Sequence, residues 1–324
     1  MNLLVTGARG FVGRELLPAL KAHGHHGIAT GRVAPTGLPS GWQGLDRSTA
    51  LAGPSEPAAC PEAIVHLEVK QHVPRPTAAD VAEFRTVNVE GTRDWLAWAF
   101  RHGVSRFILA STIKAVAAGQ GATLENAPAE RCSPYGGSKA EAEQEVIGWA
   151  AADSSRTAVI LRPAPVYGPG NEANLAAFVR QILAGKPCLI GRGETRKSIV
   201  SRTNLCAAIA FALEALGPGC HVFNVSDAGT HTLAELAAMI AELAGSPPPK
   251  RVPGWVAAAA APLGDAIEAV TGRDFPLTSA RLRALRETTV FPCDALVAAG
   301  FRHPQTTREG IAEMVAWAKS QRPA

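Results

Sequence analysis

The first part of the chain alternates short apolar runs with longer amphipathic stretches, which predicts alternating strands and helices. Strands buried on both faces are expected at residues 2–6, 27–30, 63–67, 104–110 and 157–162. Helices are expected from the glycines after residue 6 to about 23, over 80–102 and over 138–151. This alternation predicts an α/β fold, a Rossmann-type doubly wound parallel sheet. Residues 33–62 fit the pattern poorly, and both a strand ending at Asp46 and a surface loop stay open there.

Beyond residue 170 the helical period dominates. Helices are expected near 175–185, 204–216, 232–244, 254–271, 278–286, 293–299 and 307–319, with short extended pieces near 188–190, 198–201 and 222–225. We therefore expect residues 1–170 to form a dinucleotide-binding domain, and residues 171–324 a smaller, mostly helical substrate-binding cap. Residues 203–226 are expected to return to the first domain.

Composition narrows the class of protein. Of the 324 residues, 47% are hydrophobic and 19% charged, as in ordinary globular proteins. The net charge of +4 comes without a clustered basic run and gives no sign of nucleic acid as a partner. The most apolar run, 255–263, is too short to cross a bilayer, so no membrane partner is expected. The chain starts in an apolar strand without a signal peptide, and its six cysteines have no metal-ligand spacing, so we expect a cytoplasmic protein without a metal.

Three glycines separate the first strand from its helix. Gly7 suits a tight turn, Gly10 lets backbone approach a pyrophosphate, and Gly13 lets the helix pack on the strand. The amino end of the helix favours negative charge. Their place between a strand and a helix makes dinucleotide binding a better interpretation than a plain glycine-rich turn.

The end of the second strand bears on the choice of cofactor. An acidic residue here would hold the adenosine ribose of NAD, but the sequence reads Thr30-Gly31-Arg32. Arg32, together with Arg9 of the glycine loop, suits a 2′-phosphate. The expected cofactor is NAD(P), with a preference for NADP.

Tyr135 and Lys139 lie four residues apart, so on a helix they share one face. A nearby ammonium favours the phenolate and lowers the pKa of the phenol, which suits general acid–base catalysis. Pro134 and the Gly136-Gly137 pair predict a loop, with the helix starting at Ser138. Ser111 and Thr112 follow the strand that ends at residue 110, where parallel sheets bind ligands.

Taken together, the motifs resemble the extended short-chain dehydrogenase/reductase family, in particular its nucleotide-sugar epimerases, dehydratases and 4-ketoreductases. They are Thr6-Gly7-Ala8-Arg9-Gly10-Phe11-Val12-Gly13, Asn88-Val89-Glu90-Gly91-Thr92, Ser111-Thr112-Ile113-Lys114, Tyr135 to Lys139, and Leu161-Arg162-Pro163 through Gly170. The resemblance implies that Tyr135 is the acid/base, that Lys139 holds the nicotinamide ribose, and that Thr112 polarises the reacting oxygen. The implied cofactor site comprises Gly7, Arg9, Gly10, Phe11, Val12, Gly13, Arg32, Asp46, Leu67, Lys139 and Pro163.

The resemblance also bears on the substrate. Dehydratases carry an acid pair after the threonine, whereas this chain has Ile113 and Lys114, so dehydration is set aside. Ser111, Asn174, Arg196 and Lys197 would then face a nucleotide sugar. Other interpretations stay open: a reductase of a hydrophobic alcohol or ketone, favoured by the apolar stretch at 255–263, and a non-catalytic dinucleotide sensor. The family implies a homodimer through residues 80–102 and 138–151. Glu68 and Lys70 occupy a loop in which this family usually has small, apolar residues.

Overall fold

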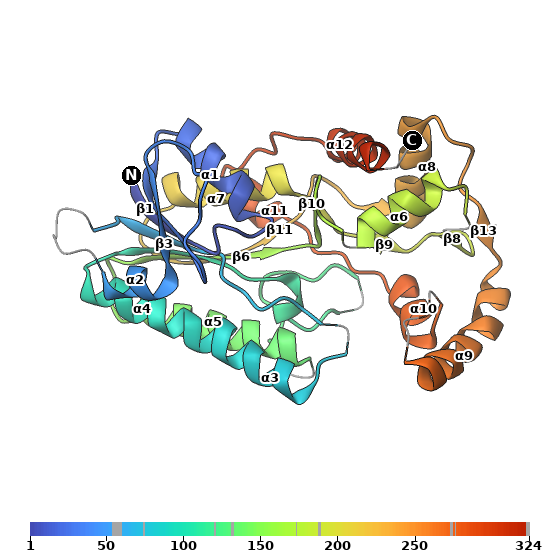
Figure 1. The fold of residues 1–324 in the computed structure, drawn as a ribbon, viewed down its shortest axis with the longest axis horizontal. Helices are drawn as coiled ribbons and strands as arrows, with labels where there is room; N and C mark the ends of the chain where they lie inside the picture. Colours follow the sequence, from blue (N-terminus) through green and yellow to red (C-terminus); the bar gives the residue numbers. More distant parts are fainter. Residues whose placement is uncertain are drawn as a thin grey trace.

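A seven-stranded parallel sheet forms the larger part of the molecule (Figure 1). The structure, a computed structural model, describes residues 1–53, 60–73, 75–119, 121–130, 133–172, 174–186, 189–272, 275 and 277–321. The strands are β1 (Asn2–Thr6), β2 (His26–Gly31), β3 (Trp42–Asp46), β4 (Ala63–His66), β5 (Arg106–Ala110), β6 (Thr157–Pro163) and β11 (Gly219–Val225). Their order, β11-β6-β5-β4-β1-β2-β3, confirms the predicted doubly wound sheet.

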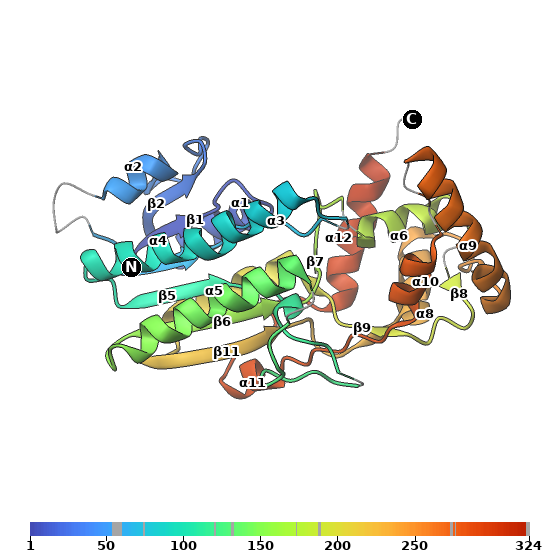
Figure 2. The same ribbon diagram turned by 90° about the horizontal axis from the view of Figure 1, so that it is seen from below.

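Helices cover both faces of the sheet. On one face lie α1 (Gly13–Ala22), α7 (Arg202–Glu214) and α11 (Asp294–Ala298), and on the other α2 (Arg47–Ala52), α4 (Gly91–Arg101) and α5 (Pro134–Ala151), as Figures 1 and 2 show. Each face has its own apolar core, one built around Leu16 and Leu20 and one around Trp95 and Trp98. The central strands are buried on both faces, which explains why their sequences are continuous apolar runs.

The sheet fixes where a ligand binds. The chain runs outward from β1 to β3 in one direction and from β4 to β11 in the other, so β1 and β4 are neighbours at the reversal. Ligands of open parallel sheets bind at the carboxyl ends of the strands at this point. Gly7, Leu67 and Ser111 follow the ends of β1, β4 and β5, so the topology brings these three loops together.

The stretch left open between residues 33 and 62 contains the strand rather than only a loop. Residues Trp42–Asp46 form β3, which pairs with β2 in parallel register from Gly27↔Trp42 to Gly31↔Asp46. Asp46 then caps α2, and its carboxylate accepts the Thr49 amide at 3.0 Å. Residues 54–59 lie outside the described part of the chain.

Two predicted helices differ in detail. The helix expected over 80–102 consists of α3 (Ala78–Phe84), a π-helical stretch η2 (Arg85–Glu90) and α4. The loop expected at 133–137 is wrong, because α5 begins at Pro134, with Ser133 as its N-cap. Proline is favourable in a first helical turn, where its missing amide hydrogen has no helical acceptor to lose. Tyr135 therefore sits inside the first turn.

The remaining elements form the cap. Helices α6 (Asn174–Leu183), α8 (Leu233–Ala244) and α12 (Thr307–Ser320) share one apolar core, and α9 (Gly254–Thr271) with α10 (Ser279–Arg286) forms a smaller one. Three two-stranded pairs tie the cap together: β10 (Val200–Ser201) with β7 (Val166–Tyr167), β12 (His231–Thr232) with β9 (Arg196–Lys197), and β13 (Arg251–Val252) with β8 (Leu189–Ile190). None of the helices that the structure describes is long and apolar enough to span a bilayer.

Candidate active site

The glycine loop has the geometry that a dinucleotide requires. Gly7 adopts φ +65°, and a Cβ there would lie 2.7 Å from the carbonyl carbon of Leu67, so no larger residue fits. A Cβ on Gly13 would lie 2.7 Å from Ala8, which shows how closely α1 packs on the loop. Within the described part of the chain, the amides of residues 11–13 donate to no protein acceptor. These free donors at the amino end of α1 fit a pyrophosphate.

The other residues expected at the cofactor site lie in two kinds of surroundings: the two arginines are exposed, and the apolar residues are packed. Arg9 lies against Gly31, with its Cγ and Cδ 3.8 Å from where a Gly31 Cβ would stand, and Arg9 and Arg32 are both exposed. Neither arginine has an ion-pair partner among the described residues. Phe11 packs under the Arg202 guanidinium at 4.7 Å. Val12 and Leu67 pack against the apolar core, and Pro163 ends β6, paired with Val225.

Thr112, Tyr135 and Lys139 come together at the carboxyl edge of β5. The Thr112 hydroxyl lies close enough to the Tyr135 phenol to favour the ionised phenol, and the Lys139 ammonium donates to the Ala110 carbonyl at 3.0 Å. Tyr135 is 8% exposed and Lys139 1% exposed. The structure therefore assembles the three residues that the sequence selected as catalytic.

The pKa of Tyr135 is raised in this structure, whereas the sequence analysis expected it to be lowered. Burial raises the pKa of Tyr135 to about 12, and the Thr112 hydroxyl opposes the shift. Burial also lowers the pKa of Lys139 to about 8, against the attraction of Glu143. The physical reason is desolvation, because burial penalises the charged form of each group. With a pKa of about 12, Tyr135 carries its proton at neutral pH.

A buried ion pair lies next to Tyr135 and Lys139 on α5. Glu143, one turn beyond Lys139 on α5, accepts hydrogen bonds from the Arg162 guanidinium at 2.7 and 3.0 Å. The Ser111 hydroxyl donates to the same carboxylate at 2.5 Å. Ser111 was expected to face the substrate, but its hydroxyl is committed to Glu143, so the structure gives it a supporting position. Pairing is what makes two buried charges tolerable here.

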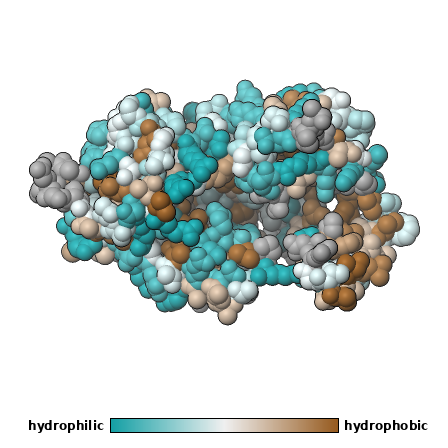
Figure 3. Space-filling model, viewed as in Figure 1, coloured by the Kyte–Doolittle hydropathy of each residue, from teal (hydrophilic) through white to brown (hydrophobic). Residues whose placement is uncertain are grey.

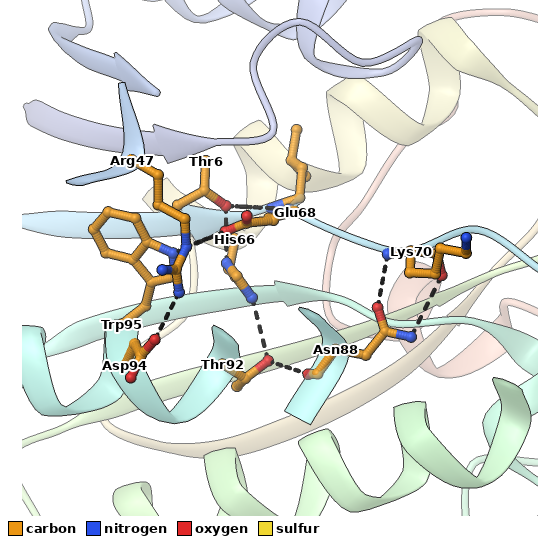
Figure 4. Close-up of polar contacts among 10 residues, drawn as sticks. Thr6, Arg47, His66, Glu68, Lys70, Asn88, Thr92, Asp94 and Trp95 are labelled. Atoms are coloured by element: carbon orange, nitrogen blue, oxygen red, sulfur yellow. Dashed lines mark hydrogen bonds and ion pairs between the residues drawn. The ribbon is translucent and has the colours of Figure 1, made fainter. Parts of the chain in front are cut away.

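A chain of hydrogen bonds runs under the loop that follows β4 (Figure 4). The Thr92 hydroxyl donates to the Asn88 carbonyl at 2.7 Å, so it accepts from Nε2 of His66 at 3.2 Å. Nδ1 of His66 then accepts from the Thr6 hydroxyl at 2.8 Å. Burial, followed by the charges of Lys139 and Arg47, lowers the pKa of His66, which agrees with a neutral ring.

The same network fixes the loop itself. The Thr6 oxygen accepts the amides of Leu67 and Glu68, each at 3.1 Å. Asn88 accepts the Lys70 amide at 2.8 Å and donates to Ser138 of α5 at 2.9 Å. Asn88 therefore braces the loop against α5.

The unexpected Glu68 has a structural explanation. Its carboxylate accepts from Nε of Arg47 at 3.2 Å and from the Trp95 indole at 3.1 Å, while Arg47 also pairs with Asp94 at 2.7 Å (Figure 4). Lys70 pairs with Asp80 and Glu83 at 3.1 and 2.6 Å. Both side chains therefore tie the loop to the helices α3 and α4.

The residues expected to clamp a diphosphate are committed elsewhere. Lys197 donates to the carbonyls of Ala284 and Glu287 at the end of α10, at 3.0 and 2.5 Å, and Arg196 donates to the Thr230 carbonyl at 3.1 Å. Both hold the cap together in this structure and do not form a free clamp. Asn174 begins α6, and its side chain lies outside the described part.

Sequence reasoning missed two features of the site. The Glu143–Arg162 pair was signalled by the spacing of Glu143, four residues after Lys139, which puts an acid on the face of α5 that turns inward. His72 packs edge-on against the Tyr135 ring, with centroids 5.7 Å apart, and no local pattern marks it. Among the described residues, no group of three or more His, Cys, Asp or Glu side chains is arranged to hold a metal ion.

Comparison with known proteins agrees with this geometry. Residues 3–226 match the NAD dependent epimerase/dehydratase family. A UDP-glucose 4-epimerase from Vibrio cholerae is 33% identical over 75% of this chain and 75% of its own. An N-acetyl-alpha-D-glucosaminyl-diphospho-ditrans,octacis-undecaprenol 4-epimerase from Escherichia coli O157:H7 is 27% identical over 96% of this chain and 93% of its own. MoeE5, solved with UDP-glucose and NAD, is 24% identical, with a TM-score of 0.74 over 99% of both chains.

The sheet and its glycine loop define a Rossmann-type nucleotide-binding enzyme of the extended short-chain dehydrogenase/reductase class. Within that class, the chain belongs to the NAD-dependent epimerase/dehydratase family. This confirms the resemblance drawn from the sequence motifs.

Proposed function

We propose that the protein is an NAD(P)-dependent 4-epimerase or 4-ketoreductase of an activated sugar, with Tyr135 as the general acid/base. The observation that carries the proposal is the contact of Thr112 with Tyr135 beside the buried Lys139. The Escherichia coli and Vibrio cholerae relatives, which are 4-epimerases by name, support the sugar 4-position as the reacting centre.

Each side chain has a distinct task in this proposal. Tyr135 gives its proton to, or takes it from, the reacting oxygen, and Thr112 holds that oxygen with its hydroxyl. Lys139 keeps donors beyond the one used on Ala110, and these would hold the nicotinamide ribose. The bound cofactor supplies hydride acceptance and donation. A cation beside the phenol would offset the desolvation that keeps Tyr135 protonated, and so bring the pKa of the phenol toward neutrality.

The cofactor is proposed to be NADP rather than NAD. Gly31 leaves the position of a ribose-binding acid empty, and the Arg9 side chain lies beside it, with Arg32 next in sequence. Two exposed guanidinium groups attract a 2′-phosphate and have no such ligand in NAD. A preference for NADP favours a one-way ketoreductase over an epimerase, which must keep its reduced cofactor through the cycle.

A second candidate function is the reduction of a hydrophobic alcohol or ketone. The observation that favours it is that Arg196 and Lys197 donate to backbone carbonyls. The diphosphate clamp expected for a nucleotide-sugar substrate is therefore not formed by these two residues. A lipid-linked sugar, as in the name of the Escherichia coli relative, lies between the two candidates because it joins a sugar to a hydrophobic carrier.

The test is a thermal-melting titration with NAD, NADP and their reduced forms, each with and without UDP, because a ligand of the folded state raises the melting temperature. We expect a larger rise with NADP, lost in Arg32→Ala and kept in Arg101→Ala, an exposed arginine on α4. A further rise with UDP supports the sugar nucleotide, and none favours the hydrophobic substrate. No response to any dinucleotide refutes both candidates.

We also propose a homodimer through α3, α4 and α5. Val81 on α3 and Phe100 on α4 are 42% and 69% exposed, and an interface over these helices would cover both. Light scattering of the wild type and of Phe100→Glu tests this: a dimer that becomes a monomer supports it, and a wild-type monomer refutes it.

A further inference from the structure

Helix α9 is apolar on two opposite faces, and only one of them is covered. Ala257, Ala261, Gly264 and Glu268 are buried, and this face packs on α10 and Leu277. The residues on the other side follow the same helical spacing and point away from the protein. They are Trp255, Ala259, Pro262, Leu263, Ala266, Ile267 and Val270.

This outer face contains the largest group of exposed apolar side chains on a single described element. Trp255 is 76% exposed, Leu263 67%, Ile267 42% and Val270 87%. Figure 3 shows a brown area at the end of the molecule where Figure 1 places α9. From residue 255 to residue 270 the stripe is about 22 Å long at the helical rise. A helix that is apolar all round is normally buried, so this face indicates a partner.

Exposed cations lie on the segments next to α9, near its amino end. Arg283 and Arg286 lie exposed on the neighbouring α10, and Arg286 donates to the Gly254 carbonyl at the start of α9 at 2.9 Å. Lys250 and Arg251 precede α9 and are also exposed. The acids nearby are fewer: Asp265 accepts the Ser279 amide at 3.0 Å, Glu268 is buried against Arg75, and Glu287 ends α10.

We infer that the outer face of α9 docks the protein on the surface of a lipid bilayer that carries anionic headgroups. An apolar stripe enters the boundary between headgroups and acyl chains, and flanking arginines and lysines meet the lipid phosphates. Trp255, at one end of the stripe, is the residue type that favours this boundary. The sequence analysis expected no membrane partner because it considered only spanning segments, and a helix lying on the surface needs far fewer apolar residues.

A second copy of the chain fits this face less well than a bilayer. A twofold interface brings the same patch of both copies together, so the arginines of one α10 would lie near those of the other. No exposed acidic cluster borders the stripe to compensate them in the described residues. An anionic surface satisfies the apolar stripe and the cations together.

The inference does not depend on the proposed function. Docking requires neither cofactor nor substrate, so the protein binds vesicles even if Tyr135 and Lys139 prove to catalyse another reaction. Docking would give the enzyme access to substrates with a lipid carrier, which both candidate functions allow.

The experiment is flotation of the full-length protein with two kinds of vesicles, phosphatidylcholine alone and phosphatidylcholine mixed with phosphatidylglycerol. We expect binding that is stronger with phosphatidylglycerol and that weakens with salt. The double variant Leu263→Glu/Val270→Glu should bind roughly a hundredfold more weakly, because each of the two lost apolar contacts costs about a factor of ten. The matched control is Leu124→Glu, which changes a residue 52% exposed in a loop outside the cap.

Tryptophan fluorescence gives a second, local readout. Trp255 is the exposed one of the six tryptophans, and the other five are buried or half-buried. Vesicles with brominated acyl chains should quench part of the emission, and Trp255→Phe should abolish that quenching while the protein still floats with vesicles. Arg283→Gln should reduce the preference for phosphatidylglycerol without affecting the quenching at saturation.

Three results would overturn the inference. One is absence of flotation with either vesicle. Another is flotation that is unchanged in Leu263→Glu/Val270→Glu, which would place the contact elsewhere. The third is a wild type that light scattering shows as an oligomer and a double variant that is smaller, because a second copy then covers the face. Circular dichroism and melting of each variant establish that it is folded.

Discussion

Helices α5 and α9 are each 18 residues long and rich in alanine. They differ in what they bury and what they expose. Helix α5 buries Tyr135, Lys139 and Glu143, and each of these polar groups has a partner: Thr112, Ala110 and Arg162. Helix α9 exposes Trp255, Leu263 and Val270 to solvent. The comparison shows that the polar groups of α5 find their partners within the chain, whereas the exposed apolar side chains of α9 have none among its described residues.

The same contrast holds for the charged groups. Near the sheet, Arg162 and Glu143 are 7% and 2% exposed and hold each other behind the catalytic helix. In the cap, Arg196 and Lys197 donate to backbone carbonyls on the rim. The charges near the sheet therefore hold α5 against β6, and those in the cap hold the end of α10 and the segment at Thr230 in place.

The largest effect is expected for Tyr135→Phe, which removes the acid/base and should lower hydride transfer by roughly a thousandfold. Nicotinamide absorbance, followed with a sugar nucleotide that stabilises the protein, measures it. The control is Tyr167→Phe. Tyr167 is the other tyrosine of the chain, and its hydroxyl donates to Asp227 at 2.7 Å. Tyr167→Phe should lose stability and keep most of its turnover. Equal losses of turnover in both would contradict the assignment of Tyr135.

The next effect concerns stability, since Glu143→Gln leaves the Arg162 charge buried without its counter-ion. We expect the free energy of unfolding in urea to fall by about 3 kcal/mol. Glu141→Gln, on the same helix with 38% of its side chain exposed, should change it by less than about 0.5 kcal/mol. A loss below about 1 kcal/mol in Glu143→Gln would show that the ion pair does not hold α5.

A smaller effect should appear as a pH dependence. Lys139 has a folded pKa of about 8, below its ordinary value of 10.5, so between these values the unfolded chain binds more protons. Stability contributed by Lys139 therefore rises with pH in this window, by about 2 kcal/mol between roughly pH 8 and pH 10. The measurement is the difference in unfolding free energy between the cofactor-free wild type and Lys139→Met. A difference that does not change with pH would mean that Lys139 is not desolvated.

The smallest effect is expected for Lys197→Met. Loss of its bonds to the α10 carbonyls should cost about 1 kcal/mol, with KM changed by less than about twofold. Lys186→Met, at an exposed position after α6, should leave both quantities unchanged. A tenfold rise in KM for a nucleotide sugar would show that Lys197 reaches the diphosphate after all, and would restore the clamp expected from the sequence.

The sequence predicted most of the fold because strand and helix periods are local. The strand β1 at residues 2–6 and the helix α9 at residues 254–271 were both predicted with the observed bounds. The weaker prediction was β3, whose Gly44-Leu45-Asp46 ending has little apolar period of its own and is held by pairing with β2. The predicted start of α5 was wrong. The capping by Ser133 and the proline in the first turn favour a helix there more than the two glycines disfavour it.

The site divides in the same way. The types and spacing of Gly7, Gly10 and Gly13, and of Tyr135 with Lys139, identified the family before any coordinates, because each role depends on a short stretch of backbone. Other contacts join residues that are 21 to 90 positions apart, and no local pattern encodes them. They are Ser111 with Glu143, Glu68 with Arg47, and Lys197 with the end of α10.

By itself, then, the sequence determined the sheet, the glycine loop after β1 and the pairing of Tyr135 with Lys139 on one helix face, since short-range periods and motifs specify them. Only the tertiary structure decided the protonation of Tyr135, because its pKa depends on burial by distant segments. The tertiary structure also decided which face of α9 is covered. An alanine-rich helix with apolar residues on every side has no preferred face until α10 and Leu277 pack against one of them.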